Sequence, residues 1–320
     1  MNSSKPIEKV NPATGEVVES FRSIRAAARQ LGINKELIRQ VLDKPHRRVG
    51  GYMWRLEGVK EVEGAKILLL DIETAPSEAY IWGLWNQDIY IDQVLSDWYM
   101  LSWAAKWLYS DTVESDRLKG SESLTTDDSR ILESLWELID QADIVIGHNL
   151  DKFDIPRIKT RFLLNDIEPP SFYKQIDTLK IARKEFDFSS NKLDFLARMM
   201  GVQIKDSVTF KLWKKCREGD DEALKELEDY NKQDVRVLED VYLKLRPYIK
   251  GHPNLDLYID DENSACPNCG STTLEAEEGK FAYTQAVRYQ MYRCKNCFAI
   301  SRNKKGLPYN NKKKISAIPR

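Results

Sequence analysis

The middle of the chain contains the run Lys66-Ile67-Leu68-Leu69-Leu70-Asp71-Ile72-Glu73-Thr74. Its consecutive apolar residues predict a strand buried on both faces, the usual state of a central strand in an α/β sheet. Residues i and i+2 of a strand point to the same face, so Asp71 and Glu73 are expected to project side by side. Two carboxylates that close repel each other unless a cation lies between them, which favours Mg²⁺ or Mn²⁺ with oxygen ligands. The alternative is a strand that merely ends in solvent.

The length of 320 residues allows two or three domains, and 42% hydrophobic and 31% charged residues are ordinary values for a soluble globular protein. No apolar run approaches the roughly 20 residues that a membrane-spanning helix needs. The first residues, Met1 to Lys5, are not followed by the apolar core of a signal peptide. We therefore expect a cytoplasmic protein with no membrane partner.

The net charge of −1 hides an uneven distribution along the chain. Residues 1–60 carry 12 basic and 6 acidic side chains, and residues 266–320 carry 11 and 3. The middle, residues 61–265, carries 26 basic and 41 acidic side chains. An acidic centre between basic ends suits a metal-dependent enzyme that acts on a polyanion held by those ends, although uneven surface charge can also be without meaning.

Residues 1–60 are expected to form a small module of their own. The stretch 10–18 predicts a hairpin, and two short helices follow it. Ser23 caps the first helix, Gly32 ends it, and Asn34 caps the second. Two short helices joined by a tight turn form a helix-turn-helix.

The motifs of this module are N-x-x-T-G-E, S-I-x-x-A-A-x-x-L-G, I-x-x-V-L and G-G-Y-x-W. They resemble the nuclease-associated modular DNA-binding domain found as an add-on in homing endonucleases. DNA contacts are then expected from the basic residues of the second helix and the segment after it, Lys35, Arg39, Arg47 and Arg48. The alternative is a helical adaptor that binds protein.

A second motif, residues 147–156, follows a buried strand at 143–147 and reads G-H-N-L-D-K-F-D-I-P. Strand, loop and helix in this order place Asp154 near a helix N-terminus above the carboxyl edge of the sheet, where ligand sites of open α/β sheets lie. We expect Asp154 to reach the metal and Asn149 and Phe153 to contact nucleic acid. The alternative is that Asp154 only caps the helix. Asp177, further on, is expected to be a structural cap.

The third motif lies on a strongly helical stretch, about residues 221–248. Tyr230 and Asp234 are four residues apart, so both project from one helix face. On its own this pair would more often be a surface Tyr and Asp.

Together and in this order, the three motifs resemble the DnaQ-like 3′–5′ exonucleases of the ribonuclease H-like superfamily, and most closely the proofreading domains of family B DNA polymerases. The resemblance covers about residues 65–250. It implies a mixed sheet flanked by helices and four metal carboxylates, Asp71, Glu73, Asp154 and Asp234, which hold two Mg²⁺ or Mn²⁺ ions. It also implies a catalytic role for Tyr230.

Aromatic side chains follow the first motif, with Tyr80, Trp82, Trp85 and Tyr90. Aromatic rings of this kind can stack on bases. More often they fill core and loop packing, and that is our expectation here.

The last domain, residues 265–303, contains the pairs Cys266/Cys269 and Cys294/Cys297, 24 residues apart. In a chain without a secretory signal, two such pairs point to metal before disulfides. They resemble a zinc ribbon with one structural, tetrahedral Zn²⁺. Cys216 stands alone and is expected to be an inert thiol. The tail, residues 304–320, is basic.

These observations predict an α/β ribonuclease H-like exonuclease domain, residues 65–250, between a helix-turn-helix module and a zinc ribbon. The expected activity is metal-dependent 3′–5′ cleavage of DNA, and the 3′–5′ direction rests on the resemblance alone. Expected partners are single-stranded DNA or duplex 3′ ends, and replication or recombination proteins. The rivals are an RNA 3′-processing exoribonuclease on the same site and a nucleic-acid-binding adaptor with an inactive nuclease core.

Overall fold

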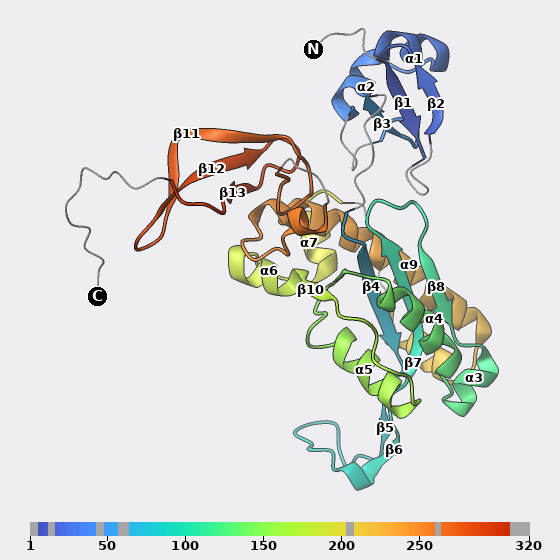
Figure 1. Cartoon of the computed structure of the whole chain (residues 1–320). Helices are drawn as coiled ribbons and strands as arrows, with labels where there is room; N and C mark the ends of the chain where they lie inside the picture. Colours follow the sequence, from blue (N-terminus) through green and yellow to red (C-terminus); the bar gives the residue numbers. More distant parts are fainter. Residues whose placement is uncertain are drawn as a thin grey trace. The chain divides into compact units, whose positions relative to one another are not determined.

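The computed structural model describes residues 6–11, 17–42, 48–56, 64–202, 208–259 and 264–307 (Figure 1). It divides into two compact units, residues 66–244 and residues 1–65 together with 245–320. Within the described ranges, no helix is both long and apolar enough to cross a membrane.

The unit of residues 66–244 is built on a five-stranded sheet in the order β10-β9-β4-β7-β8. Its central strand is β4, and β9 and β10 run parallel to it while β7 and β8 complete the sheet in antiparallel pairs. The strands are β4 (Ile67–Thr74), β7 (Met100–Trp107), β8 (Glu114–Arg117), β9 (Ile144–Gly147) and β10 (Lys174–Asp177). Residues 67–70 of β4 are buried, so the prediction of a buried central strand is confirmed.

Helices cover both faces of this sheet, and strand β7 shows how the faces divide. On one face, the indole of Trp103 donates a hydrogen bond of 2.7 Å to the carbonyl oxygen of Ile131 in α4 (Ser129–Asp140). On the other face, Lys106 pairs with Glu239 of α9 (Asp221–Leu245) at 2.6 Å. Alternate side chains of one strand thus meet helices on opposite sides, as the period of two requires. The expected mixed sheet flanked by helices is confirmed.

The remaining elements of this unit are short. Four helices are α3 (Gly120–Thr125), α6 (Thr178–Glu185), α7 (Leu193–Met199) and α8 (Phe210–Arg217), and α5 (Asp154–Leu164) follows β9. A two-stranded sheet of β5 (Glu78–Ala79) and β6 (Val94–Ser96), with the 3-10 helix η1 (Ile91–Gln93), leaves the main sheet directly after β4. Figure 1 shows this pair extending away from the end of β4.

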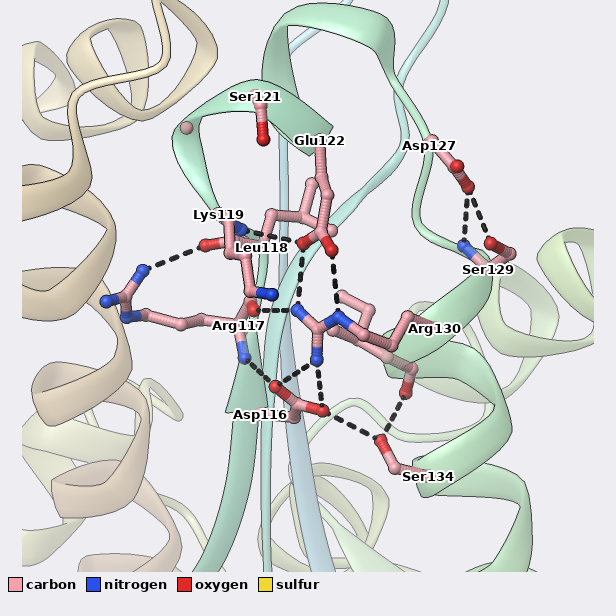
Figure 2. A network of polar contacts seen from close by, with 12 residues as sticks. Asp116, Arg117, Leu118, Lys119, Ser121, Glu122, Asp127, Ser129, Arg130 and Ser134 are labelled. Carbon is pink, nitrogen blue, oxygen red and sulfur yellow. Dashed lines mark hydrogen bonds and ion pairs between the residues drawn. The ribbon is translucent and has the colours of Figure 1, made fainter.

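A polar network joins β8, α3 and α4 (Figure 2). The guanidinium of Arg130 donates to both oxygens of Asp116 at 2.8 Å and to both oxygens of Glu122 at 2.8 Å. It also donates to the carbonyl oxygen of Arg117 at 2.8 Å. Two bidentate carboxylate contacts to one guanidinium fix the relative positions of three elements.

The N-terminal part forms the sheet β2-β1-β3, made of β1 (Ile7–Val10), β2 (Val17–Phe21) and β3 (Met53–Leu56). Helices α1 (Ile24–Leu31) and α2 (Lys35–Val41) contribute Ala27 and Ile38 to a small core around Trp54. Ser23 and Asn34 cap the two helices, and Gly32 ends the first with a φ of +66°.

The C-terminal part begins with the 3-10 helices η2 (Arg246–Tyr248) and η3 (Leu255–Tyr258). Three antiparallel strands follow in the order β11-β12-β13. They are β11 (Leu274–Tyr283), β12 (Arg288–Cys294) and β13 (Ile300–Arg302). Strands β11 and β12 form an antiparallel hairpin between the two cysteine pairs.

Candidate metal centres

Three of the predicted acidic residues lie together at the end of β4. One carboxylate oxygen from each of Asp71, Glu73 and Asp234 lies within 4.8 Å of the other two. Asp71 and Glu73 come from β4, where the period of two puts them on one face, and Asp234 comes from α9. The cluster thus joins the central strand to the helix that packs on it.

Neutral donors orient these carboxylates. The amide Nδ2 of Asn231 in α9 donates to Oδ2 of Asp71 at 2.5 Å, and Ser102 of β7 donates to Oδ1 of Asn231 at 3.3 Å. The indole of Trp213 in α8 donates to Oε2 of Glu73 at 2.9 Å. Each contact is made to one oxygen, so the second oxygen of each carboxylate is available to another ligand.

Tyr230 stands one helical turn before Asp234 and is hydrogen-bonded to it. Its ring packs edge-on against Trp213, with centroids 6.4 Å apart. Burial, first of all, and the charges of Asp234 and Glu73 raise the pKa of the Tyr230 hydroxyl. The group therefore keeps its proton at neutral pH and acts as a hydrogen-bond donor.

Asp154 lies beside this cluster, at the helix N-terminus expected for it. It is the first residue of α5 and 2% exposed, and its Oδ1 accepts a hydrogen bond of 3.3 Å from the backbone N–H of Ile72, between Asp71 and Glu73. It is not part of the set of oxygens that lie within 4.8 Å of one another. One of its oxygens is held by the β4 backbone, and Asp154 adjoins the cluster as a fourth carboxylate.

The pKa values of these carboxyls are all raised. Burial is the main cause, and it raises the pKa of Glu73 to about 7, that of Asp154 to about 8 and that of Asp234 to about 6. The pKa of Asp71 is raised well above its usual value by burial and then by the charges of Asp154, Asp234 and Glu73. Buried carboxylates this close disfavour the charged form unless a cation compensates them.

The donor set fits a divalent cation. Three carboxylates offer hard oxygen ligands within a sphere small enough for one ion, and Asp154 provides a fourth carboxylate beside them. A bound cation would replace the protons that these carboxyl groups otherwise retain because their pKa values are raised. Asp71, Glu73 and Asp234 are the residues that could hold it.

The loop from β9 to α5 is fixed by Asp177. Its carboxylate accepts from the backbone N–H groups of Asn149 and Asp151, at 3.0 and 3.3 Å. It also accepts from Leu179 and Lys180 at the start of α6, so the expected structural cap is confirmed. Asn149 has a φ of +68°, a left-handed conformation that this set of contacts supports.

Asn149 lines a cavity of about 420 Å³ beside this loop. Arg183 and Lys192 contribute positive charge to the lining, while Leu179 and Leu193 are apolar. Phe153, by contrast, packs against the main core with the guanidinium of Arg157 4.2 Å from its ring centroid. Of the two predicted contacts of this motif, Asn149 is therefore the one that lines an open space.

The aromatic residues after β4 do not fill a core, so that expectation was wrong. Trp82 is 95% exposed, Trp85 83%, and Tyr80 and Tyr90 69% each. They lie on the segment of β5, η1 and β6, which leaves the main sheet instead of packing on it.

The basic residues predicted to contact DNA lie in the N-terminal part. Lys35 is exposed, and Arg39 forms an exposed ion pair of 2.9 Å with Glu36. Arg48 begins the segment before β3, and Arg47 lies outside the described residues.

The four cysteines of the C-terminal part come together. The Sγ atoms of Cys266 and Cys297 are 3.6 Å apart, as are those of Cys269 and Cys294, and all four lie within 4.8 Å of one another. A tetrahedral zinc ion with Zn–S bonds of about 2.3 Å needs sulfur atoms about 3.8 Å apart, so the set fits zinc. None of the described cysteines forms a disulfide.

Polar groups around the sulfur atoms support this arrangement. The backbone N–H of Asn296 donates to Sγ of Cys294 at 3.4 Å, and its side-chain amide donates to Sγ of Cys269 at 3.7 Å. Asn268 donates to the carbonyl oxygens of Arg246 and Ile249, which holds the first cysteine loop on the segment after α9. Such contacts orient thiolate ligands.

Sequence reasoning missed Trp213, Asn231 and Arg157. Trp213 lies in the basic stretch 211–217, and such a composition is typical of a solvated face. Asn231 follows Tyr230 directly, and Arg157 lies one turn after Asp154. Their neighbours in the motifs were the signal that could have found them.

One comparison with known proteins agrees with this fold. A family model described as the RNase_H superfamily matches residues 107–246, a range that includes Asp154, Tyr230 and Asp234 but not Asp71 and Glu73. No curated protein matches the chain.

Among solved structures, the chain is similar to the family B DNA polymerase from the hyperthermophilic archaeon Pyrobaculum calidifontis. The sequences are 16% identical, the match covers 64% of this chain and 28% of the polymerase chain, and the TM-score is 0.45. The five-stranded mixed sheet, its flanking helices and the family match together give the central domain a ribonuclease H-like fold.

Proposed function

We propose that this protein is a metal-dependent nuclease that hydrolyses phosphodiester bonds and removes nucleotides from the 3′ end of DNA. The observation that carries the proposal is the cluster of Asp71, Glu73 and Asp234, half-buried at the end of the central strand of a ribonuclease H-like sheet. Buried carboxylates with raised pKa values are costly to fold, which supports a function for them.

Divalent cations held by Asp71, Glu73 and Asp234, with Asp154 beside them, would supply an activated water and neutralise charge at the leaving oxygen. The chain's own residues position these groups. Asn231 and Trp213 each fix one oxygen of a metal-binding carboxylate.

Tyr230 keeps its proton at neutral pH and donates it to Asp234 in the metal-free site; turned away from Asp234, this single donor would serve the attacking water or a phosphate oxygen. The 3′–5′ direction rests on the resemblance of the three motifs to DnaQ-like exonucleases.

The flanking parts fit substrate binding. We propose that residues 1–60, with their excess of basic side chains, bind DNA and that the four cysteines hold one structural zinc ion. Removal of residues 1–60 should weaken duplex binding and flatten its salt dependence, because phosphate contacts release counterions.

The test uses single-stranded DNA, duplex DNA and RNA, each labelled at the 5′ end, with Mg²⁺, Mn²⁺ or a chelator. We expect a ladder of products shortened from the 3′ end, and no products with the chelator. Preferred cleavage of RNA would favour the exoribonuclease, and binding of all three substrates without cleavage would favour the inactive adaptor.

A further inference from the structure

The segment from β5 to β6, residues 78–96, is called the arm here. It presents nine large apolar side chains that are exposed, four of them aromatic: Tyr80, Ile81, Trp82, Leu84, Trp85, Ile89, Tyr90, Ile91 and Leu95. At about 150 to 250 Å² per aromatic side chain, the four rings alone present on the order of 600 Å². The largest apolar patch on a typical monomer is about 300 to 600 Å² and is often functional.

The arm is held in shape by its own hydrogen bonds. Gln93 is central: its backbone oxygen accepts from Tyr80 and its side-chain amide donates to the Tyr80 carbonyl, at 2.9 and 3.1 Å. Its side-chain oxygen accepts from the backbone N–H of Tyr90 at 2.8 Å. Because the two ends of the arm are held together, its backbone loses less freedom on binding than that of an unbraced loop, which favours affinity.

One helix, α8, contacts both the start of the arm and the acidic site. In α8, Trp213 donates to the Glu73 carboxylate, and Arg217, one turn later, donates to the carbonyl oxygen of Pro76 at 2.7 Å. Arg217 also pairs with Glu78 at 3.1 Å. The same helix therefore contacts a candidate metal ligand and the start of the arm, and β4 leads from one to the other.

The charge of the arm excludes binding driven by phosphate contacts. It contains the carboxylates Glu78, Asp88 and Asp92, and no Lys or Arg occurs anywhere between Lys66 and Lys106. A ligand that offers aromatic faces can still stack on the rings, because stacking needs no cation. The bases of a single strand offer such faces, whereas those of a duplex are already stacked and paired.

We propose that the arm is a stacking platform for unpaired bases of the nucleic acid whose 3′ end enters the acidic site. The proposal rests on the proposed function and adds to it the part of the chain that binds the single strand or the unpaired 3′ tail. The exposed aliphatic side chains of the arm would also suit a protein partner. The connection of the arm to the acidic site through β4 and α8 favours the nucleic acid instead.

The test measures binding of the full chain to a fluorescein-labelled oligothymidylate in buffer without added magnesium or manganese, at several salt concentrations. The variants are Trp82→Ala with Trp85→Ala, the same pair changed to Phe, and Phe172→Ala. Phe172 is 82% exposed and lies just before the amino end of β10. The acidic site lies near the carboxyl end of β4, which runs in the same direction, so Phe172 is the matched control.

The double Ala variant should bind at least about tenfold more weakly, because stacking on one base is worth about that factor or more. The slope of affinity against salt should not change, since no phosphate contact is lost. The Phe pair should restore most of the affinity, and Phe172→Ala should bind like the wild type. Quenching of tryptophan fluorescence by the oligonucleotide should disappear in the double Ala variant.

Unchanged affinity in the double Ala variant, or a loss accompanied by a flatter salt slope, would overturn the proposal. Self-association of the wild type that the Ala pair abolishes, with DNA affinity unchanged, would also overturn it and assign the arm to a second copy. Because binding is measured without cleavage, a wild type that binds through the arm yet cleaves nothing would refute the proposed function and leave this inference standing.

Discussion

The side-chain amide of Asn231 lies 2.5 Å from Oδ2 of Asp71 and is completely buried. It is a direct polar link between α9 and the central strand at the acidic site, and it holds one oxygen of Asp71. An amide does this without adding a charge to an already crowded set of carboxylates.

Replacement of Asn231 by Ala should therefore weaken metal use more than substrate binding. We expect the Mg²⁺ concentration for half-maximal cleavage to rise several-fold, and stability to fall by about 1 to 3 kcal/mol because Ser102 and Asp71 lose a buried partner. Cleavage rate against Mg²⁺ concentration and urea denaturation are the measurements. An unchanged Mg²⁺ dependence would show that Asn231 has only a structural role.

Asp71→Asn and Asp234→Asn should each abolish metal-dependent cleavage while DNA binding remains. Both changes remove a charged oxygen ligand but keep the shape of the side chain. Asp229→Asn is the control on the same helix, because Asp229 is exposed and pairs with Lys232 at 3.6 Å. Full activity in either of the first two variants, purified free of host nuclease, would refute the site.

Part of this site could be predicted from the sequence because local periodicity determines it. The apolar run before Asp71 gives a buried strand, the period of two places Glu73 beside it, and the four-residue spacing places Tyr230 next to Asp234. Such rules act within one element, so they hold whatever the rest of the chain does.

The features that were missed depend on contacts between distant elements. The run of Trp82 and Trp85 has the same composition whether it packs in a core or stands in solvent, and only the tertiary structure separates the two. Asp154 was placed at the correct helix N-terminus, but its hydrogen bond to the β4 backbone could not be foreseen from spacing. Trp213 looked like one apolar residue in a basic helix until the fold brought it to Glu73.

The raised pKa values predict how stability depends on pH without metal. The carboxyls of Glu73, Asp154 and Asp234 have folded-state pKa values of about 7, 8 and 6, above their unfolded values, so the folded state binds more protons between about pH 4 and 8. Stability should fall as pH rises through this range, by at least about 1 kcal/mol.

Urea denaturation at pH 5 and pH 8, without divalent metal, measures this difference. Added Mg²⁺ should restore stability at pH 8 and have little effect at pH 5, where protons compete for the ligands. In Asp71→Asn the fall with pH should be smaller, because one repelling charge is gone. Equal stability of the wild type at the two pH values would contradict the prediction.

The network around Arg130 has the opposite pH dependence. Its hydrogen bonds lower the pKa of Glu122 to about 2, so this contact stabilises the fold above about pH 4.5 and the benefit is lost as pH falls towards 2. Arg130→Met should cost about 1 to 3 kcal/mol at pH 7, and less on acidification.

Thermal or urea denaturation of Arg130→Met and wild type at pH 7 and pH 3 gives the comparison. The control is Arg198→Met, since Arg198 and Asp194 are both more than half exposed and 4.0 Å apart. A pair of this kind contributes about 0 to 1 kcal/mol. If the two Arg variants lost the same stability, the contacts of Arg130 in Figure 2 would contribute no more to the free energy of unfolding than an exposed ion pair does.

The cysteine cluster predicts one zinc ion per chain that survives dialysis. Cys266→Ser or Cys294→Ser should lose that zinc and unfold the C-terminal strands locally, because β11 to β13 pack on one small core that contains the cysteines themselves. The control is Cys216→Ala: Cys216 is buried in the core of the other unit, where burial raises the pKa of its thiol to about 12, and it does not belong to the cluster. That variant should retain one zinc ion, as measured by elemental analysis. Absence of zinc from the wild type, or disulfides between the four cysteines in reduced cell extracts, would contradict the assignment.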